Sequence, residues 1–221
     1  MERAKRFPDV LLLRAAGGPD PMTDLAGLPV AERVMRLVRA EGATRLVATA
    51  PEAEAAPLLA HFGGLVKVSR DSANTSWRES VRAALPQIVH DPFLVADTDM
   101  LWSEGVDQPL ARLLQRDRGE GEITLLCVKP NRAHGVKRSH DFCLDPAGQV
   151  TRDYGAPVLF AGVALLDRAA LDAMTEDAFS FDALLDQALE AERLWGVVLD
   201  ADWYNLASAE GWAAAERLLV P

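Results

Sequence analysis

Cysteine is nearly absent from this chain, whose 221 residues include only Cys127 and Cys143. Two cysteines provide neither a disulfide framework nor the ligand spacing of a zinc site, and we interpret both as packing residues. Positive charge is also scarce, because 23 Lys and Arg oppose 33 Asp and Glu and leave a formal net charge of −10. Nucleic acids and anionic membranes bind surfaces with a basic patch, so this balance argues against both partners.

Long hydrophobic runs are missing as well. The apolar runs at residues 10–13 and 123–128 are far shorter than the ~20 residues that cross a bilayer. Residues 1–9, MERAKRFPD, contain no apolar stretch followed by a small-residue cleavage site, so we predict no signal peptide. We therefore expect a cytoplasmic protein with no membrane insertion. Apolar residues still make up 49% of the sequence, which is enough for a sizeable core.

Several catalytic motifs are also absent. No G-x-S-x-G is present, which argues against a serine hydrolase. The A-A-G-G at residues 15–18 lacks the G-x-G-x-x-G spacing of a dinucleotide-binding turn. The histidines show no metal-ligand spacing, and we interpret His61, at a predicted helix end, and His90, before a predicted strand, as structural.

Short apolar runs alternate with helical periods along the chain. The predicted strands are residues 10–13, 45–49, 65–68, 92–96, 123–129, 158–166 and 195–199. The predicted helices are residues 30–41, 51–62, 76–85, 181–192 and 209–219, and a hairpin is predicted at 142–150. This order predicts a three-layer α/β/α fold with a mostly parallel, Rossmann-like sheet and antiparallel strands in the second half. We expect one domain, 1–221, with halves at 1–120 and 121–221.

The most informative segment is F-L-V-A-D-T-D-M, residues 93–100. It predicts a buried strand that ends in two carboxylates, Asp97 and Asp99, at the edge of the sheet where α/β proteins bind ligands. Mg²⁺ prefers one or two such carboxylates, with its other ligands taken from phosphates and water. The alternative is that both aspartates only cap a turn and keep a loop hydrated.

Three segments in this order give the chain a resemblance to a known family. They are F-L-V-A-D-T-D-M, then V-L-F-A-G-V-A-L-L at 158–166, and finally D-W-Y-N-L-A-S-A-E-G-W-A-A-A-E-R-L-L at 202–219. Together they resemble the nucleotidyltransferases that activate sugar-1-phosphates, including the N-acetylmuramate-1-phosphate uridylyltransferases. Molybdopterin guanylyltransferases and methylerythritol-phosphate cytidylyltransferases are shorter relatives of the same type. The likeness covers most of the chain and is strongest from Asp91 onward.

The resemblance implies a Mg²⁺-dependent transfer of NMP from an NTP to a phosphorylated sugar or alcohol, with release of pyrophosphate. It places the metal on Asp99 and Asn205, and Asp99 is also catalytic. Asp97 then lies beside the nucleotide, and Gly162 on the acceptor side.

The family's glycine-rich loop is altered here. The family has L-A-A-G-x-G-T-R-M followed by P-K, whose backbone amides and cations hold the triphosphate. The corresponding residues 12–30 are L-L-R-A-A-G-G-P-D-P-M-T-D-L-A-G-L-P-V, with neither the Arg after the glycines nor the Lys before the helix. By resemblance Ala15, Ala16, Gly17 and Gly18 bind the nucleotide, and Arg14 is the candidate catalytic cation. An ordinary salt bridge is the alternative for Arg14.

The segment N-T-S-W-R-E-S-V-R-A-A-L, residues 74–85, is similar to the R-x-x-S-V pattern of the cytidylyltransferase relatives. Carried over, this places Ser80 at the nucleotide base and favours CTP or UTP. A simpler interpretation is a helix start, because Ser76 with Glu79 three residues later is a capping box.

His134, Lys137, Arg138 and His140 gather in one predicted loop of an otherwise acidic chain. A hydrated loop is the ordinary interpretation of such a segment. The alternative is a clamp for the acceptor phosphate, for which Lys137 and Arg138 are the candidates, since the second half receives the acceptor in this family.

Three functions remain open on these grounds. The first is the nucleotidyltransferase, with a possible homodimer. The second is a catalytically impaired nucleotidyltransferase-like domain that serves as a nucleotide sensor or partner subunit, as the missing cations suggest. The third is a nucleotide-sugar glycosyltransferase, because D-T-D also fits the D-x-D of those enzymes; the segment at 202–219 argues against it.

Overall fold

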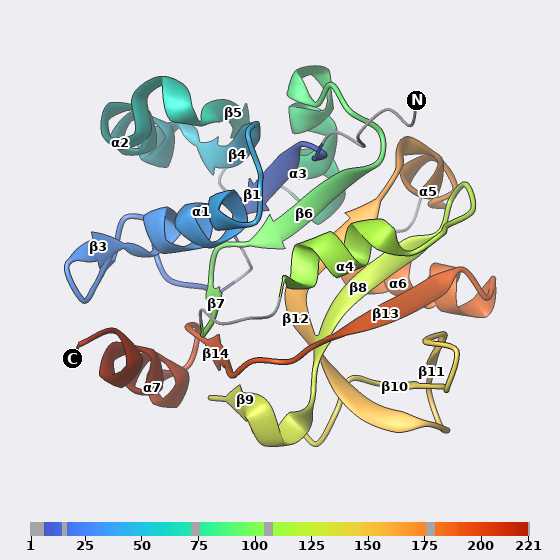
Figure 1. Cartoon of the computed structure of the whole chain (residues 1–221). Helices are drawn as coiled ribbons and strands as arrows, with labels where there is room; N and C mark the ends of the chain where they lie inside the picture. Colours follow the sequence, from blue (N-terminus) through green and yellow to red (C-terminus); the bar gives the residue numbers. More distant parts are fainter. Residues whose placement is uncertain (1–6, 15–16, 72–75, 104–107, 176–179, 221) are drawn as a thin grey trace, which may run out of the picture.

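A nine-stranded mixed sheet organises the computed structural model, counted over the residues it describes: 7–14, 17–71, 76–103, 108–175 and 180–220. Helices cover both faces of this sheet (Figure 1). The strands of the first half are β1 (Val10–Leu13), β4 (Leu46–Pro51), β5 (Lys67–Asp71) and β6 (Phe93–Asp97). Those of the second half are β8 (Ile123–Val128), β10 (Phe142–Leu144), β11 (Val150–Thr151), β12 (Ala156–Leu166) and β13 (Leu194–Leu199). The fold is therefore the predicted α/β architecture.

The strands of the first half form a parallel sheet in the order β5-β4-β1-β6. Every residue of β1 is buried, as expected for a strand covered on both faces. The register pairs Leu13 with Asp97, so the carboxyl ends of β1 and β6 lie side by side. Loops that follow these strands consequently meet at one edge of the sheet.

The sheet continues through β12, which runs antiparallel to both β6 and β8. The start of β12 pairs with β10 and its end with β6, while β13 adds parallel to β8 at the outer edge. The predicted hairpin is confirmed, because Leu144 pairs with Val150 and the Gly148 N–H donates to the Asp145 carbonyl at 3.0 Å. Antiparallel strands thus enter in the second half, as predicted.

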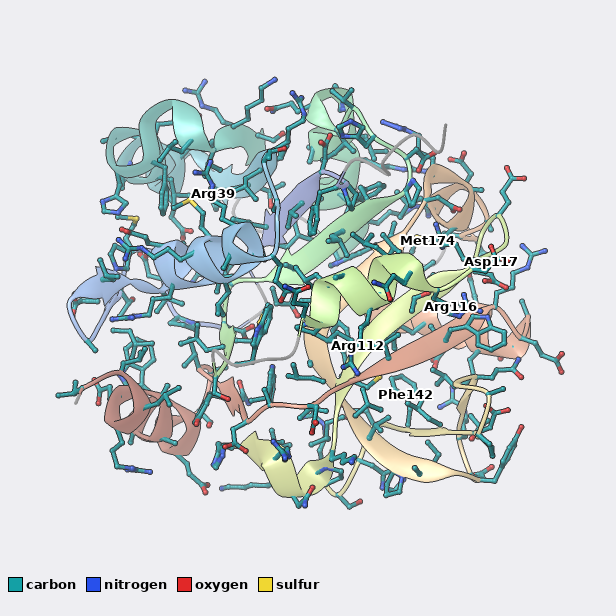
Figure 2. The ribbon with its side chains drawn as sticks, viewed as in Figure 1. Arg39, Arg112, Arg116, Asp117, Phe142 and Met174 are labelled. Atoms are coloured by element: carbon teal, nitrogen blue, oxygen red, sulfur yellow. The ribbon has the colours of Figure 1, made fainter. Side chains whose placement is uncertain are left out.

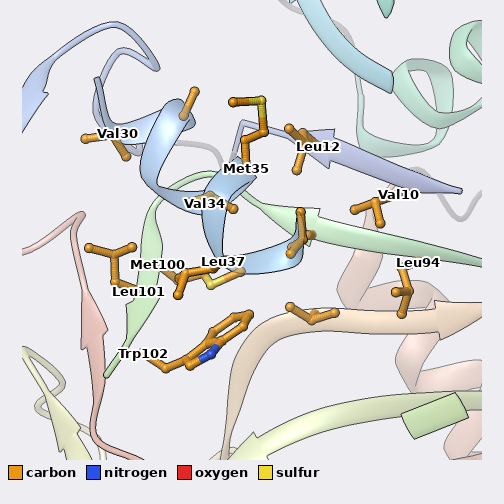
Figure 3. Packing of buried hydrophobic residues seen from close by; sticks show 14 of the residues in the cluster. Val10, Leu12, Val30, Val34, Met35, Leu37, Leu94, Met100, Leu101 and Trp102 are labelled. Atoms are coloured by element: carbon orange, nitrogen blue, oxygen red, sulfur yellow. The ribbon is translucent and has the colours of Figure 1, made fainter. Parts of the chain in front are cut away.

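Two buried clusters lie on the two faces of the sheet. One cluster packs beneath α1 (Val30–Ala40), α2 (Glu52–Phe62), α4 (Pro109–Gln115) and α7 (Ala209–Leu219). The other packs beneath α3 (Trp77–Ala84), α5 (Arg168–Asp172) and α6 (Phe181–Glu190). Strand side chains alternate between the faces: Val10 and Leu12 belong to the first cluster and Leu11 and Leu13 to the second. Figure 3 shows the cluster beneath α1, with Val34 and Leu37 of that helix directed into it.

The outer edge of the sheet is covered by Arg112 of α4 and by Arg116, which follows that helix (Figure 2). Arg112 donates a hydrogen bond to the Val198 carbonyl, and the Arg116 guanidinium lies 3.9 Å from the centre of the Trp195 ring. Such contacts cover part of an edge strand that would otherwise expose unpaired backbone groups.

Two small sheets lie outside the main one. The three-stranded sheet joins β7 (Met100–Trp102), β14 (Trp203–Asn205) and β9 (Ala133–His134). The other is a ribbon of β2 (Asp24–Leu25) and β3 (Leu28–Pro29), with Ala26 and Gly27 at φ 51° and 89° in its turn. Both were missed by the sequence pattern, because strands of two or three residues are too short to show a period.

Some predicted boundaries were wrong. A strand was predicted at 65–68, but Gly63–Leu65 forms a 3₁₀ turn (η1) and β5 begins at Lys67. Gly63 adopts φ 54° and Leu65 is 52% exposed, so the chain turns at the surface before it enters the sheet. Two further 3₁₀ turns are η2 (Leu85–Gln87) and η3 (Pro130–Arg132). Within the described residues, no helix is both long and apolar enough for a membrane span.

Candidate active site

The aspartates singled out from the sequence lie where the two halves of the sheet meet. Asp97 is the last residue of β6, between β1 on one side and β12 on the other. The chain then turns, and the Thr98 N–H donates to the Leu13 carbonyl at 2.9 Å. Asp97 and Asp99 both remain half-buried at this edge. The predicted position at the carboxyl edge of the sheet is thus the one the fold produces.

Gly162 lies directly against Asp97. It has φ +82° and sits in the register irregularity of β12, between Phe160 and Ala164. A Cβ atom at this position would lie 2.8 Å from Met100 Cγ and 3.5 Å from Asp97 Oδ2. Only glycine combines this backbone conformation with the space needed beside the carboxylate.

The electrostatic setting of both carboxylates disfavours their negative charge. Burial raises the pKa of Asp97 well above its ordinary value, and the neighbouring charge of Asp99 raises it further. Burial also raises the pKa of Asp99, although a hydrogen bond from its own backbone N–H acts in the opposite direction. Among the described residues, no Lys, Arg or His forms an ion pair with either group. Two adjacent carboxylates in this setting favour a proton or a bound cation.

Asn205 is brought to the same place by the small sheet. It pairs with Met100 across β14 and β7, and the Leu206 N–H donates to the Asp99 carbonyl at 2.8 Å. Its side chain already has structural partners: Oδ1 accepts from the Ala207 N–H at 3.1 Å and Nδ2 donates to the Gly135 carbonyl at 3.2 Å. An amide oxygen has two lone pairs, so one of them stays available to a ligand.

The donor set matches what Mg²⁺ takes from proteins. Asp97, Asp99 and Asn205 offer carboxylate and amide oxygens, which are hard ligands, at one end of β6 and β14. Over the described part of the chain, no three His, Cys, Asp or Glu side chains gather closely enough to hold a metal alone. Such a site fits a cation that completes its shell with water and phosphate oxygens, and it does not fit a closed structural metal site.

The altered glycine-rich loop follows β1. Ala15 and Ala16 lie outside the described residues, and Gly17 adopts φ +80°. Arg14 is exposed, its Nη1 donates to Glu54 Oε1 of α2 at 2.6 Å, and its Nη2 lies 3.4 Å from the Gly18 carbonyl. The cation nearest the loop is therefore bound to a carboxylate of this same chain.

The acidic residues of this loop serve its own backbone. Asp20 Oδ1 accepts from the Met22 N–H at 2.8 Å, and Asp24 Oδ1 accepts from the Gly27 N–H at 3.1 Å. Both are turns of the kind that aspartate side chains commonly stabilise. The residues that stand where the family has cations thus shape the loop.

Thr98, which was missed by sequence reasoning, adjoins a small hollow. It is only 5% exposed, and its hydroxyl has no hydrogen-bond partner among the described residues. The hollow is also lined by Arg14 and Thr49 and otherwise mostly by apolar side chains. A lone polar residue between two aspartates gives no sequence signal for this position.

Ser80 lies half-buried in α3, where its N–H donates to the Ser76 carbonyl at 3.0 Å. The capping box at the start of this helix is confirmed: the Glu79 N–H donates to Ser76 Oγ at 3.3 Å, and the Ser76 N–H donates to Glu79 Oε2 at 3.0 Å. The role of Ser80 at a nucleotide base stays a prediction.

The polar loop after β8 is more structured than expected. Arg138 binds Asp141 with both Nε and Nη2, and Lys137 is exposed. The His134 ring stacks on Tyr204, with centroids 4.7 Å apart, and His140 Nδ1 lies 3.0 Å from Ser139 Oγ. Arg138 is thus already engaged, whereas Lys137 stays a candidate for the acceptor phosphate.

Known structures share this fold over nearly the whole chain. The inositol-1-phosphate CTP transferase from T. maritima superposes with a TM-score of 0.75 at 14% identity, over 97% of this chain and 95% of that one. UTP-bound UGPase from Acinetobacter baumannii gives 0.72 at 13% identity, over 96% and 92%. HddC from Yersinia pseudotuberculosis, complexed with GMP-PN, gives 0.71 at 16% identity, over 96% and 99%. No protein-family model matches the sequence. The chain therefore has the fold of sugar-phosphate and related nucleotidyltransferases.

Proposed function

We propose that this protein is a Mg²⁺-dependent nucleotidyltransferase that transfers NMP from an NTP to a phosphorylated sugar or alcohol. One observation carries the proposal: Asp97 and Asp99 stand together at the carboxyl edge of the central sheet, and burial raises the pKa of both. A structural pair would be neutralised by a neighbouring arginine or lysine, and none of the described residues does so. The nucleotidyltransferase fold supports the same conclusion.

In this proposal Asp99 and Asn205 hold Mg²⁺, with Asp97 next to them. The bound ion would supply a positive charge that offsets the phosphates of both substrates. The reaction joins an oxygen of the acceptor phosphate to the α-phosphorus of the NTP, and the bond between the α-phosphorus and the pyrophosphate oxygen breaks. Gly162 lets β12 pack closely against Asp97 and Met100, because a Cβ there would lie 2.8 Å from Met100 Cγ and 3.5 Å from Asp97 Oδ2.

Arg14 is the candidate cation for the triphosphate. It follows the last residue of β1, and its guanidinium already lies beside the loop at Gly18. Glu54 holds it there through the 2.6 Å ion pair. For Arg14 to bind phosphate it must share or leave Glu54, and this competition would weaken its contribution relative to an unpaired arginine.

The direct test is pyrophosphate release. The protein is incubated with Mg²⁺, each of the four common NTPs and a panel of phosphorylated sugars and alcohols. We expect release with one NTP and one acceptor class, and none after addition of EDTA. No release from folded protein across the whole panel would contradict the proposal.

A second function, nucleotide binding without turnover, is favoured by the Arg14–Glu54 pair and by the absence of Lys from residues 15–32. A ligand that binds only the folded state raises the melting temperature as its concentration rises. A nucleotide that raises Tm without any pyrophosphate release would identify a sensor or partner subunit instead of an enzyme.

A further inference from the structure

Arg14 and Glu54 form an ion pair beside the loop that follows β1. Arg14 Nη1 donates to Glu54 Oε1 at 2.6 Å, and Glu54 belongs to the first turn of α2, where the helix dipole favours a negative charge. The other carboxylate oxygen, Glu54 Oε2, is buried and has no hydrogen-bond partner among the described residues. Within this part of the chain, the carboxylate group is therefore held by a single contact, the one between its Oε1 and Arg14.

This ion pair is weaker by its geometry than the pair of Arg138 and Asp141. Arg138 binds both oxygens of its carboxylate with Nε and Nη2. Arg14 binds one oxygen of Glu54 with one nitrogen, and the two side chains are 38% and 24% exposed. Single contacts between partly exposed ions contribute little to stability, so a ligand can separate Arg14 from Glu54 at small cost.

The position of Arg14 connects this pair with the paired aspartates. Arg14 directly follows Leu13, the last residue of β1, which pairs with Asp97. Arg14 and Thr98 also line the same hollow, and the buried hydroxyl of Thr98 lacks a hydrogen-bond partner within the described ranges. The phosphates of a nucleotide whose cation lies on Asp99 would thus have Arg14 beside them.

The next cation along the chain is already used by the fold. Residues 15–32 contain neither Lys nor Arg. Arg33 then donates through Nε and Nη2 to the backbone carbonyls of Leu25 and Ala26, both at 2.6 Å, and so holds the turn between β2 and β3. In the proposed function the triphosphate therefore depends on Arg14.

We propose that Glu54 competes with the triphosphate for Arg14 and thereby sets the affinity of the site for nucleotides. This inference rests on the proposed function and concerns the regulation of its site. A triphosphate that binds Arg14 separates the arginine from Glu54, and the lost contact subtracts from the affinity gained. A monophosphate that binds at the cation without reaching Arg14 leaves the ion pair intact. Glu54 therefore weakens the binding of NTP and leaves that of NMP unchanged.

The test compares wild type with Glu54→Gln by calorimetric titration in the presence of Mg²⁺. The probes are the four common NTPs, the matching NMPs and inorganic triphosphate. We expect Glu54→Gln to bind the triphosphates about two- to fivefold more tightly, the effect of one partly exposed ion pair, and the NMPs as wild type does. Glu52→Gln is the matched control, because it removes the same charge from the same turn of α2. Glu52 pairs instead with Arg70 at 2.9 Å, with both side chains exposed, so this variant should keep the wild-type affinities.

Arg14→Gln shows whether the effect of Glu54 passes through this arginine. It should weaken triphosphate binding by a larger factor in the Glu54→Gln background than in wild type, because Arg14 then binds phosphate without giving up a contact. A general repulsion by the Glu54 charge would give equal factors in the two backgrounds and would overturn the inference.

The inference is also overturned by unchanged or weaker triphosphate binding in folded Glu54→Gln, by an equal gain in Glu52→Gln, or by an absence of triphosphate binding in every variant. The proposed function fails separately, if wild type releases no pyrophosphate from any NTP. The titrations with inorganic triphosphate then still decide on Glu54.

Discussion

Carboxylates stand at both ends of the strand pair β1–β6, buried at the amino end and half-buried at the carboxyl end, and they differ in their partners. At the amino end, Asp9 is 0% exposed and has a full set of partners. Arg45 Nε donates to it at 3.1 Å, His90 Nδ1 lies 2.7 Å away, and the Val89 N–H also donates. At the carboxyl end, Asp97 has the negative charge of Asp99 beside it instead of a cation.

The pKa values of the two ends move in opposite directions. Burial alone would raise the pKa of Asp9, but the hydrogen bonds from the Val89 N–H and from His90 outweigh it and lower that pKa. Burial raises the pKa of Asp97 and Asp99. A satisfied carboxylate stabilises the fold, whereas an unsatisfied one costs stability and persists where binding or catalysis needs it. The two ends thus separate a structural site from a candidate functional one.

The largest expected effect is at the amino end. Asp9→Ala should lower the free energy of unfolding by roughly 2–4 kcal/mol, because it leaves the Val89 and His90 N–H groups and the Arg45 guanidinium without their acceptor. Urea denaturation at pH 7 measures this loss. The variant should keep pyrophosphate release while it is folded. A loss below about 1 kcal/mol would show that Asp9 is not the structural anchor of this end.

Replacing an aspartate by alanine at the carboxyl end should lower activity and leave stability nearly unchanged. Asp99→Ala should reduce pyrophosphate release by about 10²–10³-fold, the effect of removing one electrostatic group from a transition state. Its unfolding free energy should stay close to that of wild type. Asp117→Ala, at an exposed aspartate (Figure 2), is the control and should keep full activity. Equal activity of Asp99→Ala and Asp117→Ala would remove Asp99 from the site.

Gly162→Ala tests how closely the carboxyl end is packed. The added Cβ would lie 2.8 Å from Met100 Cγ, and the backbone would keep φ +82°. We expect a cost of roughly 1–3 kcal/mol in unfolding free energy and weaker metal-dependent nucleotide binding. Thermal unfolding and nucleotide titration measure the two effects. Gly64→Ala, with open space around the glycine and no positive φ, should change neither.

Neutralising substitutions give the smallest effects and the sharpest contrast. In EDTA at pH 7, Asp97→Asn should raise Tm by a few degrees, since about 1 kcal/mol corresponds to roughly 2–4 °C at this size. Asp9→Asn should lower Tm. The raised pKa of Asp97 destabilises wild type above that pKa, and the lowered pKa of Asp9 stabilises wild type above it.

The differences in Tm between each of these two variants and wild type should therefore disappear on acidification, each over a different pH range. The Asp97 difference should begin to close first, as the pH falls from the raised pKa toward the ordinary carboxyl value. The Asp9 difference should persist until the pH falls below that ordinary value. Melting curves between pH 3 and pH 8 read out the order. A destabilised Asp97→Asn variant at pH 7 would contradict the account.

Local patterns were sufficient to predict the parallel half of the fold. Continuous apolar runs such as 93–96 and helix stops such as Gly42, which adopts φ 110°, are signals within a few residues. They also placed Asp97 and Asp99 at the carboxyl edge. The resemblance, not the pattern, pointed to Asn205, because β14 is only Trp203–Asn205 and reaches Asp99 through a register set by the fold.

Contacts between distant positions could not be predicted in this way. Asp9 is 36 residues from Arg45 in sequence, and Arg14 is 40 from Glu54. Neither ion pair has a local signature. The sequence left open both a catalytic role and an ordinary salt bridge for Arg14, and the structure shows a salt bridge with Glu54. A group of aromatic rings likewise joins α3, β12 and α6 through tertiary packing alone.

The most direct test of the central claim is the thermal shift of wild type and Asp99→Asn, titrated with Mg²⁺ in the presence of each NTP. We predict that Mg²⁺ with one NTP raises the Tm of wild type by roughly 5–10 °C at about a hundredfold excess over Kd, and that Asp99→Asn loses this shift. An equal shift in both proteins, or none in wild type with any NTP, would contradict the assignment of the paired aspartates to a cation and nucleotide site.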